Sequence, residues 1–93
     1  MNRNANLRER IFARSSLRPL KAPAFLVIDG LQRTPDTSLQ LDALSLTFTA
    51  ICQSVNIDPH DLIVRSKRQL ADADVLKNPE IEAIRDYAAG EMK

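Results

Sequence analysis

Residues 37–59 read TSLQLDALSLTFTAICQSVNIDP and hold the strongest structural signal in this chain of 93 residues. Apolar side chains recur there at intervals of three and four residues, the repeat of one helical face: Leu41, Leu44, Phe48, Ile51 and Val55. A second apolar stripe runs along roughly the opposite side of the same helix: Leu39, Ala43, Leu46 and Ala50. A helix that is apolar on two sides is buried on two sides, so each stripe needs something to cover it.

The second stripe is the best functional lead in the sequence. Two or three other short helices can cover one side of the central helix, whereas the second side must pack inside the domain, against another protein or against a second copy. We take four residues as the candidate partner-binding surface, with self-association as one form of that binding: Leu39, Ala43, Leu46 and Ala50.

Capping residues mark out the helices of the carboxyl-terminal half. Asp or Asn followed by Pro is typical of a helix start. The Asp or Asn side chain accepts a hydrogen bond from a free backbone N–H of the first turn, and Pro has no backbone N–H that would need a partner there. The signals are Thr37 with Gln40 as a capping box, Asn56 as a left-handed stop, Asp58 before Pro59, Asn78 before Pro79, and a final Gly90. They predict helices near residues 38–55, 59–74 and 79–90. The expected core consists of Leu41, Leu44, Phe48, Ile51, Leu62, Leu70, Ile81 and Ile84.

The amino-terminal part predicts a different kind of structure. Residues 1–21 read as a basic arm that contains a short helix, followed by a single small domain over residues 22–93. The run AFLVI at residues 24–28 is rich in strand formers, and the Asp-Gly pair that follows is a turn signal. We therefore expect a short β-ribbon over residues 24–33, and an α+β fold class that is mostly helical.

Composition argues against catalysis. The only two glycines, Gly30 and Gly90, lie far apart, so no phosphate-cradling loop can form, and no nucleophile signature is present. A single cysteine, Cys52, and a single histidine, His60, leave too few ligands for a cysteine cluster or a two-imidazole metal site. We expect a non-enzymatic protein without catalytic residues, metal, cofactor or small-molecule substrate. The longest apolar run is too short to cross a membrane and the lone thiol fits a reducing compartment, so the expected location is the cytoplasm.

Charge is unevenly distributed along the chain. Residues 1–38 carry seven basic and three acidic side chains, whereas residues 39–93 carry six basic and nine acidic ones. A basic head on an acidic body can serve an anionic partner, or the two ends can attract each other.

The segment from Cys52 to Leu62 also fits a helix-turn-helix pattern, which gives an alternative function. Its second helix, residues 59–74, would present basic side chains to a DNA duplex: His60, Arg65, Lys67 and Arg68. Within it, Asp61-Leu62 followed by Arg65-Ser66-Lys67-Arg68 resembles the origin-binding helices of the DnaA family of bacterial replication initiators, which implies DNA binding. However, any helical hairpin with a tight turn satisfies this spacing, and acidic residues stand at the expected reading end.

Short stretches in a fixed order carry a further resemblance: LRERIFA at 7–13, LKAP at 20–23, a central helix at 43–52, LADADVLK at 70–77, and a last helix at 81–89. Their layout resembles that of the small tail assembly chaperones of long-tailed phages. The resemblance implies a non-enzymatic protein that shields an apolar, helical tail component until assembly, and it assigns no functional residue. The principal hypothesis is therefore a protein-binding adaptor or assembly chaperone, with a DNA-binding regulator as the alternative.

Overall fold

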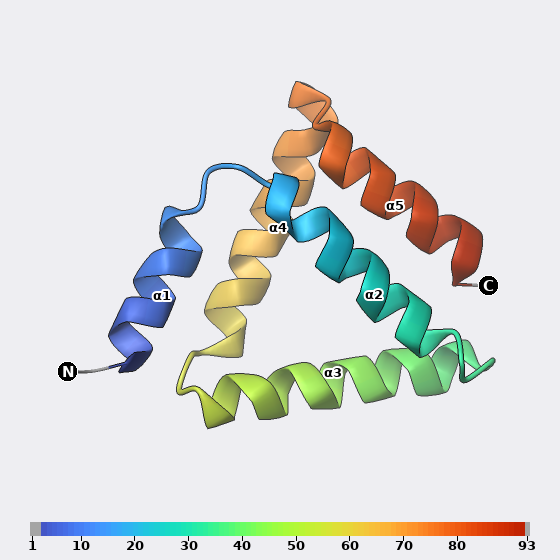
Figure 1. Cartoon of the computed structure of the whole chain (residues 1–93), viewed down its shortest axis with the longest axis horizontal. Helices are drawn as coiled ribbons and strands as arrows, with labels where there is room; N and C mark the ends of the chain where they lie inside the picture. The colour runs from blue at the N-terminus through green and yellow to red at the C-terminus, as the bar shows by residue number, and fades with distance from the viewer. Residues whose placement is uncertain (1–2, 93) are drawn as a thin grey trace.

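This computed structural model describes residues 3–92, which form five α-helices and one short 3-10 helix joined by short loops (Figure 1). They are α1 (Arg3–Ala13), η1 (Arg18–Leu20), α2 (Lys21–Leu31), α3 (Thr37–Ser54), α4 (Pro59–Leu76) and α5 (Pro79–Glu91). No strand occurs within residues 3–92, so the prediction of an α+β fold class is wrong and this part of the chain is all-helical.

The expected β-ribbon over residues 24–33 is replaced by α2 and the turn that follows it. Pro23 is compatible with the helix because it lies in the first turn, where backbone N–H groups have no partner within the helix. Gly30 lies in the last turn without a positive φ, so the Asp-Gly pair forms no hairpin turn. A short apolar run fits a buried helix as well as a strand, and packing decides between them.

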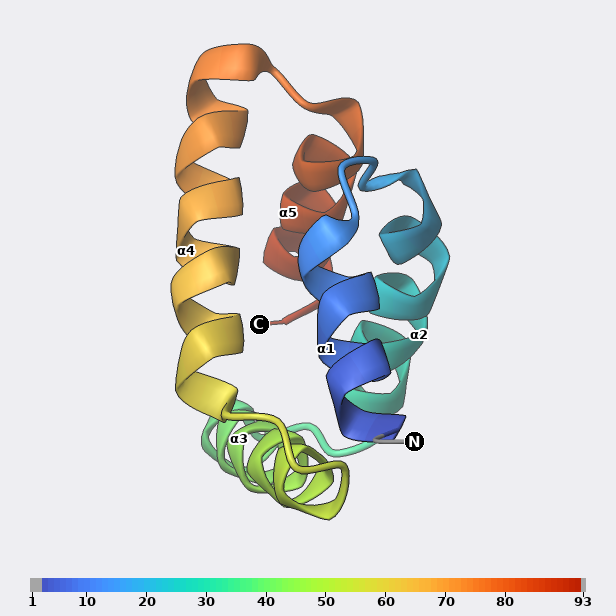
Figure 2. The same cartoon turned by 90° about the vertical axis from the view of Figure 1, so that its left-hand side faces the viewer.

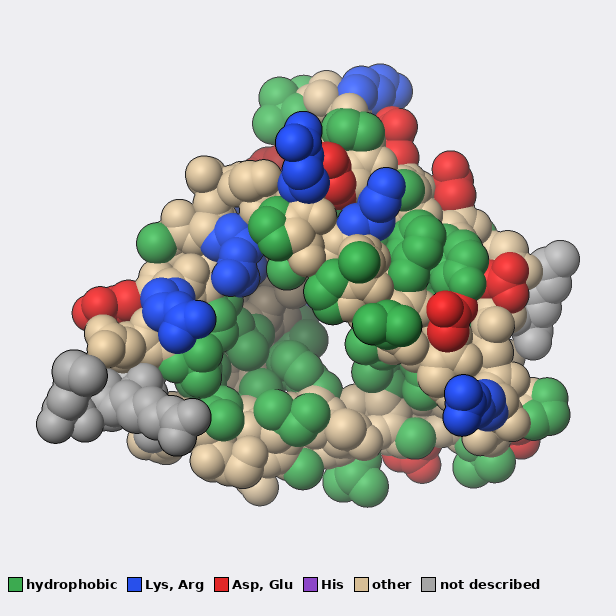
Figure 3. Space-filling view, in the orientation of Figure 1, with side chains coloured by type: hydrophobic (Ala, Val, Ile, Leu, Met, Phe, Trp, Pro, Cys, Tyr) green, Lys and Arg blue, Asp and Glu red, His purple; other side chains and the backbone are tan. Residues whose placement is uncertain are grey.

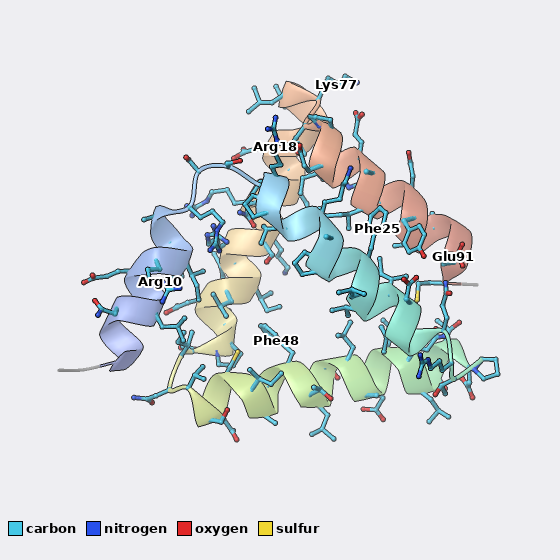
Figure 4. The ribbon with its side chains drawn as sticks, in the orientation of Figure 1. Arg10, Arg18, Phe25, Phe48, Lys77 and Glu91 are labelled. Atoms are coloured by element: carbon cyan, nitrogen blue, oxygen red, sulfur yellow. The ribbon has the colours of Figure 1, made fainter. Side chains whose placement is uncertain are left out.

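That packing is the contact between α2 and α5. The rings of Phe25 and Tyr87 are stacked, with centroids 4.3 Å apart and planes 6° apart, and Figure 4 shows Phe25 on the side of α2 that faces α5. The Tyr87 hydroxyl donates to Asp29, and Gln32 Nε2 donates to Glu91 Oε2 at 2.6 Å. Positions 25, 29 and 32 share one helical face, which is why a helix and not a strand satisfies all these contacts.

Tyr87 is the only tyrosine in the chain, so its titration reports on this contact directly. Its hydrogen bond to Asp29 raises the pKa of Tyr87 from 10.0 to about 12, with smaller contributions from burial and from the charges of Asp29 and Glu91. Because folding raises this pKa, the neutral phenol favours the folded state. That contribution is complete below pH 10.0 and disappears as the pH rises through about 12.

We expect ultraviolet absorbance titration of the folded protein to show phenolate forming at a midpoint near pH 12, against about pH 10 in denaturant. Asp29→Asn is expected to lower the midpoint towards 10, since it removes the charged acceptor. Asp86→Asn, one residue from Tyr87, serves as the matched control and should leave the midpoint unchanged. A midpoint near 10 in the folded parent would show that the Tyr87–Asp29 contact is absent.

The structure confirms three capping predictions, two of them in the turn between α3 and α4. Asn56 has a left-handed φ of 58°, and the Ile57 N–H donates back to the Cys52 carbonyl at 2.9 Å, which ends α3 as a Schellman motif. Cys52 and Ile57 are both buried, so the turn carries its own apolar contact. Asp58 then caps α4 by accepting from the His60 N–H at 2.9 Å. At the start of α5, Asn78 accepts from the Ile81 N–H in the same way.

Two other capping predictions are wrong. The N-cap of α3 is Asp36 rather than Thr37, and it accepts from the Ser38 N–H at 2.9 Å and from the Ser38 hydroxyl at 2.7 Å. These bonds, the one from the hydroxyl first, hold the pKa of Asp36 below its usual value. Gly90 does not end α5, which continues to Glu91. Asp36 wins because a carboxylate is a stronger acceptor than a hydroxyl for the free N–H groups of the first turn.

The helices enclose an open centre instead of a filled core. α2, α3 and α4 form three sides of a triangle in Figure 1, and Figure 3 shows hydrophobic side chains gathered around an opening between them. The radius of gyration is 14.2 Å, against about 12 Å for a typical domain of this length. The accessible surface is 7000 Å², against about 5,400 Å² for a folded monomer of this mass.

The predicted core is accordingly wrong in part. Among the eight expected core residues only Ile81 is buried, while Phe48, Leu62 and Ile84 are half-buried. The exposed members of the set are Leu41, Leu44, Ile51 and Leu70. Helical spacing identifies the apolar side of a helix, but the other helices of this chain leave much of that side uncovered.

Candidate functional site

The second stripe of α3 lies on the surface along its whole length. Leu39 is 54% exposed and Leu46 is 71% exposed, and Ala43 and Ala50 between and after them are exposed as well. Packing inside the domain therefore does not account for this stripe. In α3 the stripe alternates leucine and alanine at spacings of four, three and four residues, the spacing of a coiled-coil seam.

A hollow of about 520 Å³ opens beside this stripe, where the end of α2 meets the start of α3. Its lining consists of Gly30, Leu31, Thr34, Leu39, Gln40, Asp42, Ala43 and Leu46. The hollow continues the stripe onto α2, so an apolar side chain that lies on Leu39 also reaches Leu31.

Gln40 holds the two helices together at this hollow. Its side chain is only 4% exposed, and its Nε2 donates to the carbonyls of Leu31 at 3.1 Å and Thr34 at 2.7 Å. Both carbonyls also accept backbone N–H groups, from Thr34 and Asp36 respectively, so Gln40 adds a second bond to the turn that joins α2 to α3. The Gln40 Oε1 atom has no hydrogen-bond partner among the described residues. The sequence prediction assigned Gln40 to a capping box and missed this role, because nothing in the local pattern places Gln40 beside Leu31.

The first stripe of α3 contributes further apolar surface on the opposite side. Leu41, Leu44 and Ile51 are all exposed, and Phe48 points from α3 towards the open centre of the triangle (Figure 4). At the carboxyl-terminal end of this stripe Val55 is half-buried, and the neighbouring Cys52 is buried. α3 is thus apolar on two sides, as the sequence predicts, and the described chain buries neither side fully.

The structure brings together three of the four residues predicted to bind nucleic acid. His60, Arg65 and Arg68 line a groove of about 820 Å³ between α1 and α4, whereas Lys67 does not. Figure 2 shows α1 and α4 side by side, with α5 behind them. Arg8, Phe12 and Arg14 of the amino-terminal arm form the opposite wall and were not predicted. The arginine-rich pattern of residues 1–21 is the signal for them, but it does not show which element they face.

Contacts across this groove fix α1 onto α4. Arg8 Nη2 lies 3.0 Å from Asp61 Oδ2 in a half-exposed ion pair, and Arg65 Nη2 donates to the Arg14 carbonyl at 3.3 Å. Both guanidinium groups also lie against the Phe12 ring, with the Arg8 Cζ 4.3 Å and the Arg65 Cζ 5.8 Å from its centroid. Asp61 and Arg65 are therefore already engaged with α1, on the helix that would have to read DNA.

Other kinds of site find little support within residues 3–92. No group of three or more His, Cys, Asp or Glu side chains in the described part of the chain could hold a metal ion. None of its helices is long and apolar enough to span a bilayer. Comparisons with protein-family models, curated proteins and solved structures give no match to this chain.

Proposed function

We propose that this protein is a non-enzymatic protein-binding module, an adaptor or assembly chaperone of the cytoplasm, that holds an apolar helical partner against α3. The exposure of Leu39 and Leu46 carries the proposal. Completing the burial of these two side chains would contribute roughly 2–4 kcal/mol. A chain with so few buried residues loses a large part of its possible stabilisation if that surface stays in water.

The side chains of the stripe also favour a helix as the partner. Within the second stripe of α3, Leu39 and Leu46 are large side chains that project outwards. Ala43 and Ala50 are small and leave room for the side chains of a facing helix. The seam carries no charge of its own, so the expected partner face is apolar. A phage tail component, as the resemblance to tail assembly chaperones suggests, would be one such partner and belongs to the proposal.

The test is binding of a synthetic amphipathic helix with leucines on one face and uncharged polar residues elsewhere. We expect the parent protein to bind it with an affinity that changes little between low and high salt, because the contact is apolar. Leu46→Glu is expected to abolish binding, since it places a charge in the centre of the seam. Ser45→Glu adds the same charge to the adjacent residue, about 100° away around the helix, and should leave binding intact.

Circular dichroism of the same variants measures their helix content and so separates a loss of binding from a loss of folding. Loss of binding in Leu46→Glu with full helix content supports the stripe as an interface. Equal binding by Leu46→Glu and the parent would contradict the proposal.

The DNA-binding alternative has less support from the geometry. The turn at residues 55–58 does join two helices in the expected way, but α1 lies on the face of α4 that holds Asp61 and Arg65. A DNA-binding module would bind generic duplex with an affinity that falls steeply as salt rises. Replacing Arg65, Lys67 and Arg68 by Ala should remove that binding only if the alternative is correct.

A further inference from the structure

The groove between α1 and α4 concentrates the positive charge of the molecule. Five cationic side chains line it, against only two carboxylates: Arg8, Arg14, Arg65, Arg68 and Lys77, with Asp61 and Asp72. The whole chain has a formal net charge of only +1, so the rest of the molecule is acidic. Arg8 and Arg14 come from the basic amino-terminal part, whereas the other three cations come from the acidic carboxyl-terminal part, so the fold brings together charges that are separate in the sequence.

Arg65 lines this groove and has no ion-pair partner among the described residues. It is half-buried, its Nη2 donates to the Arg14 carbonyl at 3.3 Å, and its guanidinium lies against the Phe12 ring. A partly desolvated guanidinium that is held in place but not ion-paired favours an anionic ligand, because little further side-chain entropy is lost when the ligand binds.

The remaining lining shows which kind of anion fits. Apolar side chains lie among the cations, namely Phe12, Leu17, Val64 and Leu76, all at least partly exposed. A carboxylate-bearing segment with its own apolar side chains would satisfy both features. A nucleic-acid backbone fits less well, because Asp61 and Asp72 would repel closely spaced phosphates. In addition, the Phe12 ring already holds two guanidinium groups where a base would stack.

We propose that the groove between α1 and α4 binds an acidic, amphipathic segment of a partner protein, whose carboxylates pair with Arg65 and Arg68. This site is separate from the α3 stripe, and either one can exist without the other. The Arg8–Asp61 pair holds α1 in place as one wall, and Arg68 and Lys77 have no ion-pair partner among the described residues.

The test uses a labelled synthetic helix with glutamates on one face and leucines on the other, measured by fluorescence anisotropy. We expect binding that weakens as salt rises and that is lost when the glutamates are replaced by lysines. Arg65→Gln combined with Arg68→Gln is expected to weaken binding about tenfold, which corresponds to the loss of two ion pairs in the upper half of the range for exposed pairs. Lys67→Gln removes the same charge from the adjacent residue outside the groove and should stay within about twofold of the parent.

Two further variants distinguish binding in this groove from a damaged fold and from binding at the α3 stripe. Asp72→Asn removes a repulsive carboxylate from the lining and is expected to tighten binding, a gain that a damaged fold would not produce. Leu46→Glu is expected to leave binding unchanged, which separates this groove from the α3 stripe.

Three results would overturn the proposal. One is equal binding of the glutamate helix by the parent and by the Arg65→Gln, Arg68→Gln protein. The second is no binding by the parent. The third is tighter binding of duplex DNA than of the glutamate helix, together with a loss in Lys67→Gln, which would assign the cations to nucleic acid.

Discussion

Ile28→Ala and Ile81→Ala are each expected to destabilise the fold by about 2–5 kcal/mol, the range for removing a buried isoleucine side chain. Ile28 on α2 is 9% exposed and Ile81 on α5 is 8% exposed. Only five apolar residues of the described chain are buried, so neighbouring helices have few other contacts to compensate. A loss of this size is a large part of the total stability of a small domain.

Urea denaturation followed by circular dichroism measures this loss. Leu26→Ala is the matched control, because Leu26 lies two residues from Ile28 on the same helix and is 70% exposed. Its expected effect is below about 0.5 kcal/mol. Leu44→Ala, at a position where helical spacing alone predicts core, is expected to cost less than Ile28→Ala. Similar losses at Leu26 and Ile28 would show that Ile28 is not buried as described.

The second large effect concerns self-association. The accessible surface of 7000 Å² exceeds the monomer expectation by roughly 1,600 Å². Stable homodimers commonly bury about 1,000–2,500 Å² on each partner, so this excess is large enough to form such an interface. Leu39 and Leu46 form the seam that a second copy of α3 can cover when no other partner is present. We therefore expect the isolated chain to dimerise, with a melting temperature that rises with protein concentration.

Sedimentation over a range of concentrations measures this equilibrium. Leu46→Glu is expected to be monomeric and Ser45→Glu dimeric, because only the first change places a charge in the seam. Two results together would contradict this prediction: a parent protein that sediments as a monomer at high concentration, and a Leu46→Glu protein as stable as the parent. They would show that the second stripe is exposed without forming an interface.

Local signals were sufficient where a helix boundary depends on adjacent residues. Asp58, Asn78 and Asn56 act on backbone groups within a few positions of themselves, so the sequence predicts their roles correctly. Asp36 was missed because the spacing of Thr37 and Gln40 also fits a capping box, whereas the neighbouring Asp36 is the stronger acceptor and forms the N-cap. The two apolar stripes of the central helix were likewise readable, since helical spacing alone determines which side chains share a face.

Tertiary structure decided everything that depends on distant residues. Residues 24–28 form a helix because Phe25 meets Tyr87, a contact between positions far apart in the sequence. Whether an apolar stripe is core or surface depends on what lies opposite, and for Leu46 nothing in the described chain does. The cationic groove likewise exists only because Arg8 and Arg14 are placed against α4 by the fold. Periodicity and capping are properties of neighbouring residues, whereas burial and charge clustering arise only when separate helices are brought together.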